Sequence, residues 1–178
     1  MVISEANLVN HRIVRALLFL GLFWISGCGF QLNRNQVSLP KGARTLSLTV
    51  SNQTYSSGLD LELRRELSRL FSASNVKQAP SSSADLALSV TLTQVSYQRT
   101  DLSLYNNQSY RFHFSQTAQL KLRDQRDEKW LFKGVELNGE FDFETTATEL
   151  GTEDMRDSRK KALINLAQKV ADQLSQNF

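Results

Sequence analysis

The chain has 178 residues, with 21 basic and 18 acidic side chains, so its formal charge at pH 7 is only +3. This near balance, without a basic run that contains aromatic residues, excludes the usual signature of a nucleic-acid-binding protein. One cysteine and two histidines are too few for most zinc sites or nucleophile–histidine pairs, and the eight glycines form no phosphate-binding loop. We therefore expect no cofactor, no metal site, no nucleic-acid partner and no enzymatic activity.

The amino-terminal residues follow the order of a bacterial secretion signal. Arg12 and Arg15 precede an apolar run over residues 16–24, which is too short to span a bilayer comfortably. The only cysteine follows small residues, in the sequence Ile25-Ser26-Gly27-Cys28. This ending resembles the lipobox of bacterial lipoproteins. The resemblance implies a signal peptide over 1–27 that is removed, an S-diacylglycerol group on the new terminal cysteine and an N-palmitoyl group on its amino nitrogen.

Lipidation of Cys28 would place the protein on a membrane surface. A single acyl chain binds a membrane only marginally, whereas several chains hold firmly, so no spanning helix would be needed. Gly29 follows the cysteine, and the absence of Asp there favours the outer membrane in enteric bacteria. Residues 28–44 would form a lipidated terminus and polar tether, and residues 45–178 a single domain. The alternative is an ordinary anchor helix with an incidental cysteine.

The first part of that domain predicts a strand, a helix and a second strand. Residues 45–50 have an apolar side chain at every second position, as in a half-buried strand. A helix is expected from a capping box of Ser57 and Asp60 to about Ser72. Its apolar face comprises Leu59, Leu63, Leu67, Leu70 and Phe71. In the next strand, the apolar positions shift by one residue near Thr93–Gln94, which indicates a β-bulge.

The second part predicts two further strands and a final helix. One face of the third strand carries Tyr110, Phe112, Phe114, Ala118, Leu120 and Leu122. The last strand begins with Trp130, which we expect in the core. The final helix is expected to start with Thr152 as its N-cap residue. Tyr97, Tyr105 and Tyr110 are expected at a rim or an interface, and core packing would explain Tyr110 equally well.

The element order β-α-β-β-β-α predicts an α+β fold. A short right-handed crossover makes the first two strands parallel, and hairpins make the other neighbours antiparallel. We expect a two-layer sandwich, a four-stranded mixed β-sheet with two helices on one face. The later strands exceed the average strand length, so the sheet should be long and strongly twisted.

The start of the mature chain resembles a known family. It reads Cys28-Gly29-Phe30-Gln31-Leu32, and Leu39-Pro40 precedes the first strand. The LptE family of lipopolysaccharide-assembly lipoproteins begins with Cys-Gly-aromatic-x-Leu and has a proline just before its first strand. The length and element order of the mature chain are similar to those of that family as well.

This resemblance implies a function and its partners. A family member plugs the lumen of the outer-membrane β-barrel LptD, assists its assembly and binds lipopolysaccharide, which the barrel inserts into the outer leaflet. Basic residues in two loops of the family contact lipopolysaccharide, but here 104–109 and 145–154 contain none. Arg99 and Arg111 flank the first of these loops, so they are our candidates for contact with lipopolysaccharide phosphates.

The last predicted strand carries a row of carboxylates on its outward face. Glu140, Asp142 and Glu144, together with Glu136, are candidates to meet basic residues of the barrel wall, although an ordinary solvated strand face is the alternative. His113 is expected on the same outward face, toward solvent or a partner. A basic group near the opposite end is interpreted as ordinary surface charge; it consists of Arg123, Arg126, Lys129 and Lys133.

Two other functions remain open on the sequence. A different outer-membrane lipoprotein could act as a periplasmic lipid carrier, but that function needs a deep apolar cavity, for which this fold leaves little room. An enzyme acting on cell wall or lipid would use Glu140 and Asp142. An open strand face neither raises a carboxyl pKa nor excludes water, which argues against the enzyme.

Overall fold

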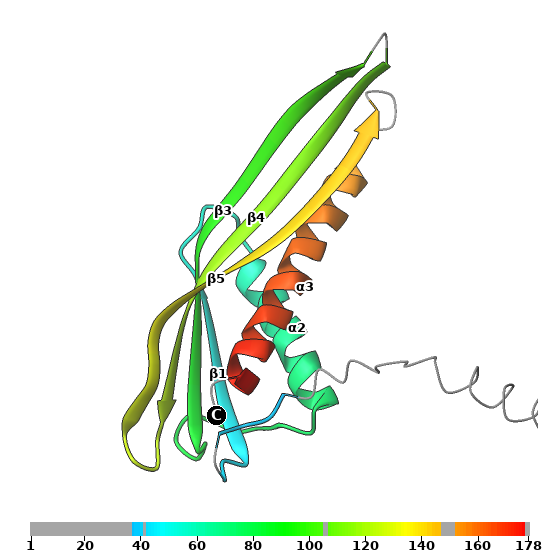
Figure 1. Cartoon of the computed structure of the whole chain (residues 1–178). Coiled ribbons are helices and arrows are strands. Elements are labelled where there is room, and N and C mark those ends of the chain that lie inside the picture. Colours follow the sequence, from blue (N-terminus) through cyan, green and yellow to red (C-terminus); the bar gives the residue numbers. More distant parts are fainter. Residues whose placement is uncertain (1–36, 41, 105–106, 147–151, 177–178) are drawn as a thin grey trace, which may run out of the picture. The chain divides into compact units, whose positions relative to one another are not determined.

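The computed structural model describes residues 37–40, 42–104, 107–146 and 152–176, and all of them belong to one compact unit, Asn35–Phe178. Cys28 with its lipobox and Tyr105 lie outside the described residues. The described part of the chain is an α+β fold whose elements follow the predicted order (Figure 1). The elements are β1 (Thr45–Asn52), α2 (Leu59–Ala73), β2 (Lys77–Gln78), β3 (Leu86–Leu104), β4 (Asn107–Asp124), β5 (Lys129–Thr146) and α3 (Thr152–Gln176).

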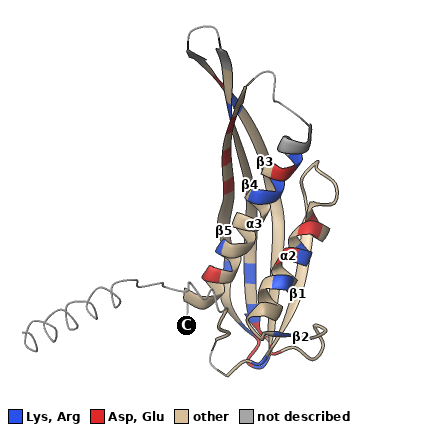
Figure 2. Ribbon diagram, turned by 90° about the vertical axis from the view of Figure 1, so that its right-hand side faces the viewer, with Lys and Arg blue, Asp and Glu red and all other residues tan. Residues whose placement is uncertain are grey.

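The strands form one mixed sheet in the order β2-β1-β3-β4-β5. β1 is parallel to both β2 and β3, and the β3–β4 and β4–β5 pairs are antiparallel. The sheet has five strands where the sequence predicted four, because β2 is a two-residue strand and is too short to show a periodic pattern. Figures 1 and 2 show α2 and α3 side by side on one face of the sheet.

The main core lies between the two helices and the facing side of the sheet. α2 contributes Leu59, Leu63, Leu67 and Phe71, all fully buried. The sheet contributes the alternating residues that the strand pattern predicted; they are Leu46, Leu48, Leu86, Leu88, Val90, Leu92, Ala118, Leu120 and Leu122. Burying each such side chain stabilises the fold by roughly 1.5–3 kcal/mol relative to its exposure, so this pattern fixes which face of the sheet the helices cover.

The predicted capping box at the start of α2 is wrong. Gly58 occupies the N-cap position with φ of 82°, and no side chain caps the first N–H groups of the helix with a hydrogen bond. Only glycine adopts this left-handed conformation at little steric cost. The N-cap of α2 is therefore Gly58, one residue later than the predicted Ser57. Asp60 and Glu62 still lie in the first turn, where the helix dipole favours their negative charge.

A β-bulge interrupts the register of β3 and β4 between Leu92 and Gln94, as the sequence predicted. The bulge keeps the apolar side chains of both halves of β3 on the helix side of the sheet. Beyond it, a second apolar cluster forms under the first half of α3. Its buried residues are Phe112, Phe114 and Ala162, and Tyr110, Phe141, Phe143 and Met155 pack against them.

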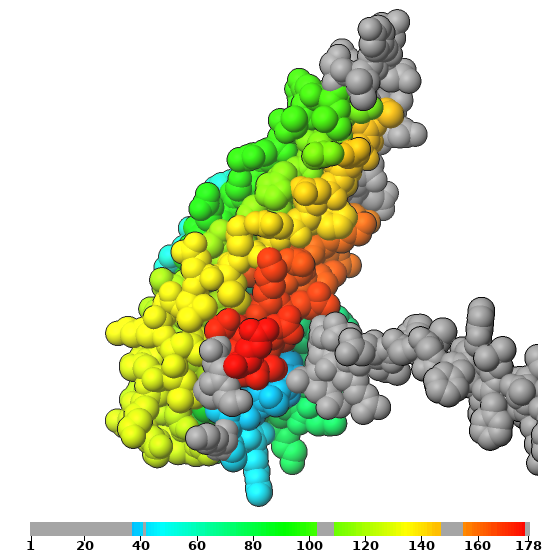
Figure 3. Space-filling view, viewed as in Figure 1, coloured from blue at the N-terminus to red at the C-terminus, as the bar shows by residue number. Residues whose placement is uncertain are grey.

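Helix α3 covers the outer edge of β5 as well as the face of the sheet. Asn165 Oδ1 accepts the backbone N–H of Glu140 at 3.3 Å, and Lys169 Nζ donates to the backbone oxygen of Asn138 at 2.7 Å. Figure 3 shows α3, in orange and red, lying against β5, in yellow. These contacts satisfy polar groups that an edge strand would otherwise offer to another chain.

Trp130 is not in the core, contrary to the sequence prediction. Half of its surface is exposed, and it lies opposite Arg123, whereas Phe132 lies opposite the buried Leu122. One extra residue, Leu131, therefore separates the two aromatic side chains, and this bulge turns Trp130 to the face away from the helices.

Candidate functional site

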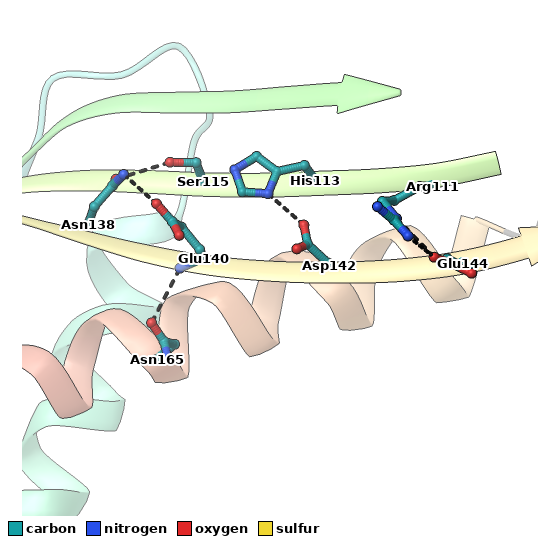
Figure 4. A network of polar contacts seen from close by, with 8 residues as sticks. All are labelled: Arg111, His113, Ser115, Asn138, Glu140, Asp142, Glu144 and Asn165. Atoms are coloured by element: carbon teal, nitrogen blue, oxygen red, sulfur yellow. Dashed lines mark hydrogen bonds and ion pairs between the residues drawn. The ribbon is translucent and has the colours of Figure 1, made fainter. Parts of the chain in front are cut away.

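The outward face of β4 and β5 carries a row of charged and polar residues that oppose one another across the two strands. Arg111 lies opposite Glu144, and His113 lies opposite Asp142. Arg111 Nη2 lies 2.5 Å from Glu144 Oε1, and His113 Nδ1 lies 2.5 Å from Asp142 Oδ1 (Figure 4). The carboxylates predicted to meet a barrel wall are therefore already paired with residues of the neighbouring strand.

The same row continues toward the middle of the sheet as a network of hydrogen bonds around Asn138. Asn138 accepts at Oδ1 from the hydroxyl of Ser115 at 3.0 Å and from that of Thr117 at 2.9 Å. Its Nδ2 donates to Glu140 Oε1 at 2.9 Å. We call the residues from Arg111 and Glu144 to Thr117 and Asn138 the polar ladder. Every named side chain in it has a partner within the protein.

The electrostatics of the polar ladder favour the charged form of Arg111. Hydrogen bonding to Glu144, followed by its negative charge, raises the pKa of Arg111 above its usual value. Both side chains of this pair are more than half exposed, so water and salt screen their attraction. The ladder therefore sets which side chains face each other and contributes little to stability.

The two arginines predicted to contact lipopolysaccharide point to opposite faces of the sheet. Residues directly opposite each other share a face; Arg99 lies opposite Phe112, and Arg111 lies opposite Thr100. Phe112 is buried under α3, so Arg99 is on the helix side and Arg111 on the outward side. The sequence placed both beside one loop, but the register of β3 and β4 prevents them from forming a joint anion site.

Arg99 has its own set of contacts. Its Nε lies 3.1 Å from Asp101 Oδ1, and its guanidinium lies 4.9 Å from the centre of the Tyr110 ring. The rings of Tyr97 and Phe112 stack nearby, with centroids 5.6 Å apart. Tyr97 is 43% exposed, which agrees with the predicted rim position. A planar cation beside aromatic rings remains able to bind an anion on its free side.

The opposite end of the sheet holds the start of β1 against β3 and the β4–β5 turn. Asp85 Oδ2 accepts the backbone N–H groups of Arg44 at 2.7 Å and Thr45 at 3.0 Å. These two bonds, the first being the larger cause, lower the pKa of Asp85 below its usual 3.8. At the turn, hydrogen bonding to Arg126 is the main cause of a lowered pKa of Asp124. At this end, Asp85 joins the start of β1 to the chain before β3, and Asp124 with Arg126 closes the β4–β5 turn.

Two kinds of site are missing from the described part of the chain. None of its helices combines the length and apolar character that a membrane span requires. Within the same residues, no three histidine, cysteine, aspartate or glutamate side chains are grouped as metal ligands would be. The features that remain are surfaces: the polar ladder, the aromatic cluster near Arg99 and the basic end near Trp130.

The sequence matches the LptE lipopolysaccharide-assembly family over residues 43–177, which is about three quarters of the chain. The chain belongs to this family. Family membership confirms the resemblance drawn from the mature start and the element order. The family is described as one of lipopolysaccharide assembly, so membership implies an assembly role. No curated protein matches the chain.

Solved structures resemble the LptE-family fold of this chain at low identity. A neuraminyllactose-binding hemagglutinin homologue from Helicobacter pylori is 13% identical with a TM-score of 0.51, and the match covers 77% of this chain and 86% of that one. A minor lipoprotein from Acinetobacter baumannii is 16% identical with a TM-score of 0.49, over 78% and 95% of the two chains. Rare lipoprotein B from Shewanella oneidensis is also 16% identical, with a TM-score of 0.39, over 73% and 91%. The likeness to the Helicobacter protein extends to the fold alone.

Proposed function

We propose that this LptE-family protein is an outer-membrane lipoprotein, anchored through Cys28, that plugs the lumen of the β-barrel LptD. In this position it would help the barrel to fold and would support insertion of lipopolysaccharide into the outer leaflet. The family match supplies the assembly role. The resemblance of residues 25–28 to a lipobox supports the anchor.

The observation that carries the plug proposal is the internal pairing of the polar ladder. The lumen of an outer-membrane barrel is polar, so a plug needs a polar surface. Enclosing an unpaired charge is costly, whereas a paired and hydrogen-bonded charge can be enclosed at much lower cost. Arg111 with Glu144 presents such a paired charge, and His113 hydrogen-bonds the Asp142 carboxylate beside it, on one face of a long strand pair.

The carboxylates of the ladder are proposed contacts for the barrel wall. Each carboxylate has about four lone-pair sites, and the pairs described for Glu140, Asp142 and Glu144 leave some of them free. Arginine or lysine side chains of the wall could bind there. Such charge complementarity would fix the orientation of the plug more than it would increase affinity.

Lipopolysaccharide contact by Arg99 and Arg111 is proposed separately for each arginine, because they lie on opposite faces. Arg99 is the better placed of the two, since its only carboxylate partner among the described residues is the exposed Asp101.

The runner-up function, a lipid carrier, gains no support. A groove of about 390 Å³ between α2 and α3 is lined largely by charged side chains, including Glu62, Arg65 and Lys160, and an acyl chain would not bind there.

Affinity isolation tests the plug directly. A tagged form of the protein is isolated from detergent-solubilised outer membranes, and a photo-crosslinking residue replaces Asp142 in a parallel sample. A plug predicts recovery of one large outer-membrane barrel in near-equal amount, and a crosslink from position 142 to that barrel. Recovery of the protein alone would exclude the proposal. A crosslinker at Leu61, which is exposed on α2, reports whether the helix side is enclosed as well.

A further inference from the structure

The outward face of the sheet changes character toward the β4–β5 turn. The polar ladder with its carboxylates occupies the half near the start of α3, whereas Lys121, Arg123 and Lys133 lie toward the turn. Figure 2 shows the same separation, with red bands on one half of β5 and blue bands on the strands nearer the turn. We call the three cations and Trp130 the basic aromatic patch.

Trp130 is the centre of this patch. It is half exposed, and two cations flank its ring: the Arg123 guanidinium at 5.9 Å and the Lys133 ammonium at 5.7 Å from the ring centre. Leu131, next to it, is 37% exposed. In Figure 3 the yellow atoms of β5 lie at the surface around this turn. A large aromatic side chain in this position contributes nothing to the core that the helices cover.

The cations of the patch lie close together although they repel one another. Lys121 lies directly opposite Lys133, and like charges at opposed strand positions destabilise a sheet. Neither lysine forms an ion pair among the described residues, and Glu136 is the nearest carboxylate along β5 on that face. Arg123 has only a 3.5 Å pair with Glu128, which is 81% exposed. An anionic partner outside the chain would relieve this repulsion.

Apart from the long pair of Glu128 with Arg123, the acidic residues of the turn do not neutralise the patch. Asp124 is nearly buried and is bound by Arg126, so that pair is closed within the turn. Asp127 and Glu128 are exposed at its tip, where Lys129 offsets one of them. Across the sheet, the outward positions beside Arg123 and Lys121 on β3 are Ala87 and Ser89, which are small and uncharged. The patch is therefore a positive surface around one half-exposed aromatic ring.

The chain reaches the domain at this same end of the sheet. Val37, where the described chain begins, donates its N–H to Ser74 Oγ at the end of α2, on the helix side of this end. Further along, Arg44 is bonded to Asp85, and the carbonyl of Asp85 accepts the N–H of Gln125 in the β4–β5 turn at 2.8 Å. From Cys28 to Val37 the chain can span at most about 30 Å when fully extended. If Cys28 holds the protein on a leaflet, the patch therefore lies at the end of the domain that the anchor keeps close to that leaflet.

We propose that the basic aromatic patch binds the anionic glycerophospholipid surface of the leaflet that holds the Cys28 acyl chains. Trp and Lys or Arg side chains are the residue types that concentrate at membrane–water interfaces, the ring at the headgroup level and the cations near phosphates. Each cation near an anionic surface strengthens binding about fivefold. The proposal rests on the anchor in the proposed function and adds an orientation: the β4–β5 turn faces the leaflet and the polar ladder extends away from it.

Fluorescence of Trp130 tests the proposal, because Trp24 is the only other tryptophan. The full chain carrying Trp24→Phe is expressed, purified in detergent and reconstituted into phosphatidylethanolamine vesicles with or without phosphatidylglycerol. With phosphatidylglycerol, we expect a blue-shifted emission, quenching by brominated phospholipids and at least twofold lower quenching by acrylamide. The variant Lys121→Gln/Lys133→Gln should lose most of the brominated-lipid quenching, and high salt should have the same effect.

The matched control is Arg64→Gln/Arg65→Gln, which removes the same charge from an exposed face of α2 and should leave the fluorescence unchanged. Unquenched Trp130, or quenching that survives removal of both lysines, would overturn the proposal. The proposal would also be overturned if lipopolysaccharide, without phosphatidylglycerol, protected Trp130 equally from acrylamide. Loss of the brominated-lipid quenching of Trp130 when the barrel binds would overturn it as well. The mass of the amino-terminal peptide and recovery of the barrel report the proposed function separately, so its failure can be told apart from failure of the patch.

Discussion

Gly139 of β5 and Leu166 of α3 lie so close together that no side chain fits between them. A Cβ atom on Gly139 would overlap the Cβ of Leu166 and would lie 2.5 Å from the carbonyl oxygen of Ala162. The absent side chain lets α3 approach β5 between the main core and the aromatic cluster. Leu166 is fully buried at that point. One glycine thus sets the distance between the two layers along the strand that carries the carboxylates.

We expect Gly139→Ala to destabilise the protein by about 1–3 kcal/mol, the usual cost of forcing extra atoms into a packed core. The atoms it would meet include helix backbone, which cannot move aside as a flexible side chain could. The measurement is the free energy of unfolding by urea, followed by far-ultraviolet circular dichroism. Glu136→Ala, an exposed change on the same strand, should stay within about 0.5 kcal/mol of the unchanged chain. Equal stability of the two variants would show that the layers separate easily.

The sequence predicted the parts of the fold that depend on local pattern. The alternation from Leu86 to Leu92 and its phase shift located both the buried face of β3 and its bulge. The position of Trp130 could not be found this way, because the residues after it, Leu131 and Phe132, are both apolar and hide the second bulge. The two-residue strand β2 has no period at all.

The candidate site shows the same limit at longer range. Alternation alone placed Glu140, Asp142 and Glu144 on the outward face, and the structure agrees. The same alternation places Arg111 on the face of His113, two residues away, but which carboxylate it opposes depends on the register of strands far apart in the sequence. That register is fixed by the bulges and by packing under α3, which no short segment encodes.

Charge reversal separates folding from barrel contact in the polar ladder. Glu144→Arg puts two cations opposite each other at the Arg111 position, so we expect recovery of the barrel in affinity isolation to fall at least twofold. Adding Arg111→Glu restores an opposite-charge pair across the strands. The thermal midpoint that Glu144→Arg lowers should then return to that of the unchanged chain. If the carboxylate faces basic residues of the wall, the double variant should fold normally but still recover little barrel.

Glu62→Arg, on an exposed face of α2, is the control for a general change of charge. Unchanged recovery by Glu144→Arg would remove Glu144 from the contact. Full recovery by the double variant would show that only the internal pair matters.

Asp85 should make the stability of the domain depend on pH. Its pKa is lowered in the folded protein, chiefly by the backbone N–H of Arg44 and then by that of Thr45. A lowered carboxyl pKa stabilises the fold at every pH above the usual 3.8, and this contribution is lost as the pH falls through the folded value. Asp85→Ala should therefore lower the urea midpoint at pH 7 and at pH 5, and the difference from the unchanged chain should shrink below pH 3.8.

The exposed Asp172 of α3 provides the comparison for this experiment, because it has no hydrogen bond or ion pair among the described residues. Asp172→Ala should leave the midpoint nearly unchanged at each pH. A difference for Asp85→Ala that stays constant down to pH 2 would show that the carboxylate charge is not what holds the start of β1.

The anchor is tested by two substitutions around the proposed lipidation site. Cys28→Ala removes the sulfur that would accept the diacylglycerol, so we expect the protein to leave the membrane fraction. Gly29→Asp keeps that sulfur, and in an enteric host it should leave the protein lipidated but shift it to the inner membrane. Sucrose-gradient fractionation, with mass spectrometry of the amino-terminal peptide, measures both outcomes. The fractionation is done in cells depleted of the barrel and after a high-salt wash, so that neither barrel binding nor the basic aromatic patch retains the variant. If Cys28→Ala still stays with the membrane, residues 16–24 act as an uncleaved anchor helix.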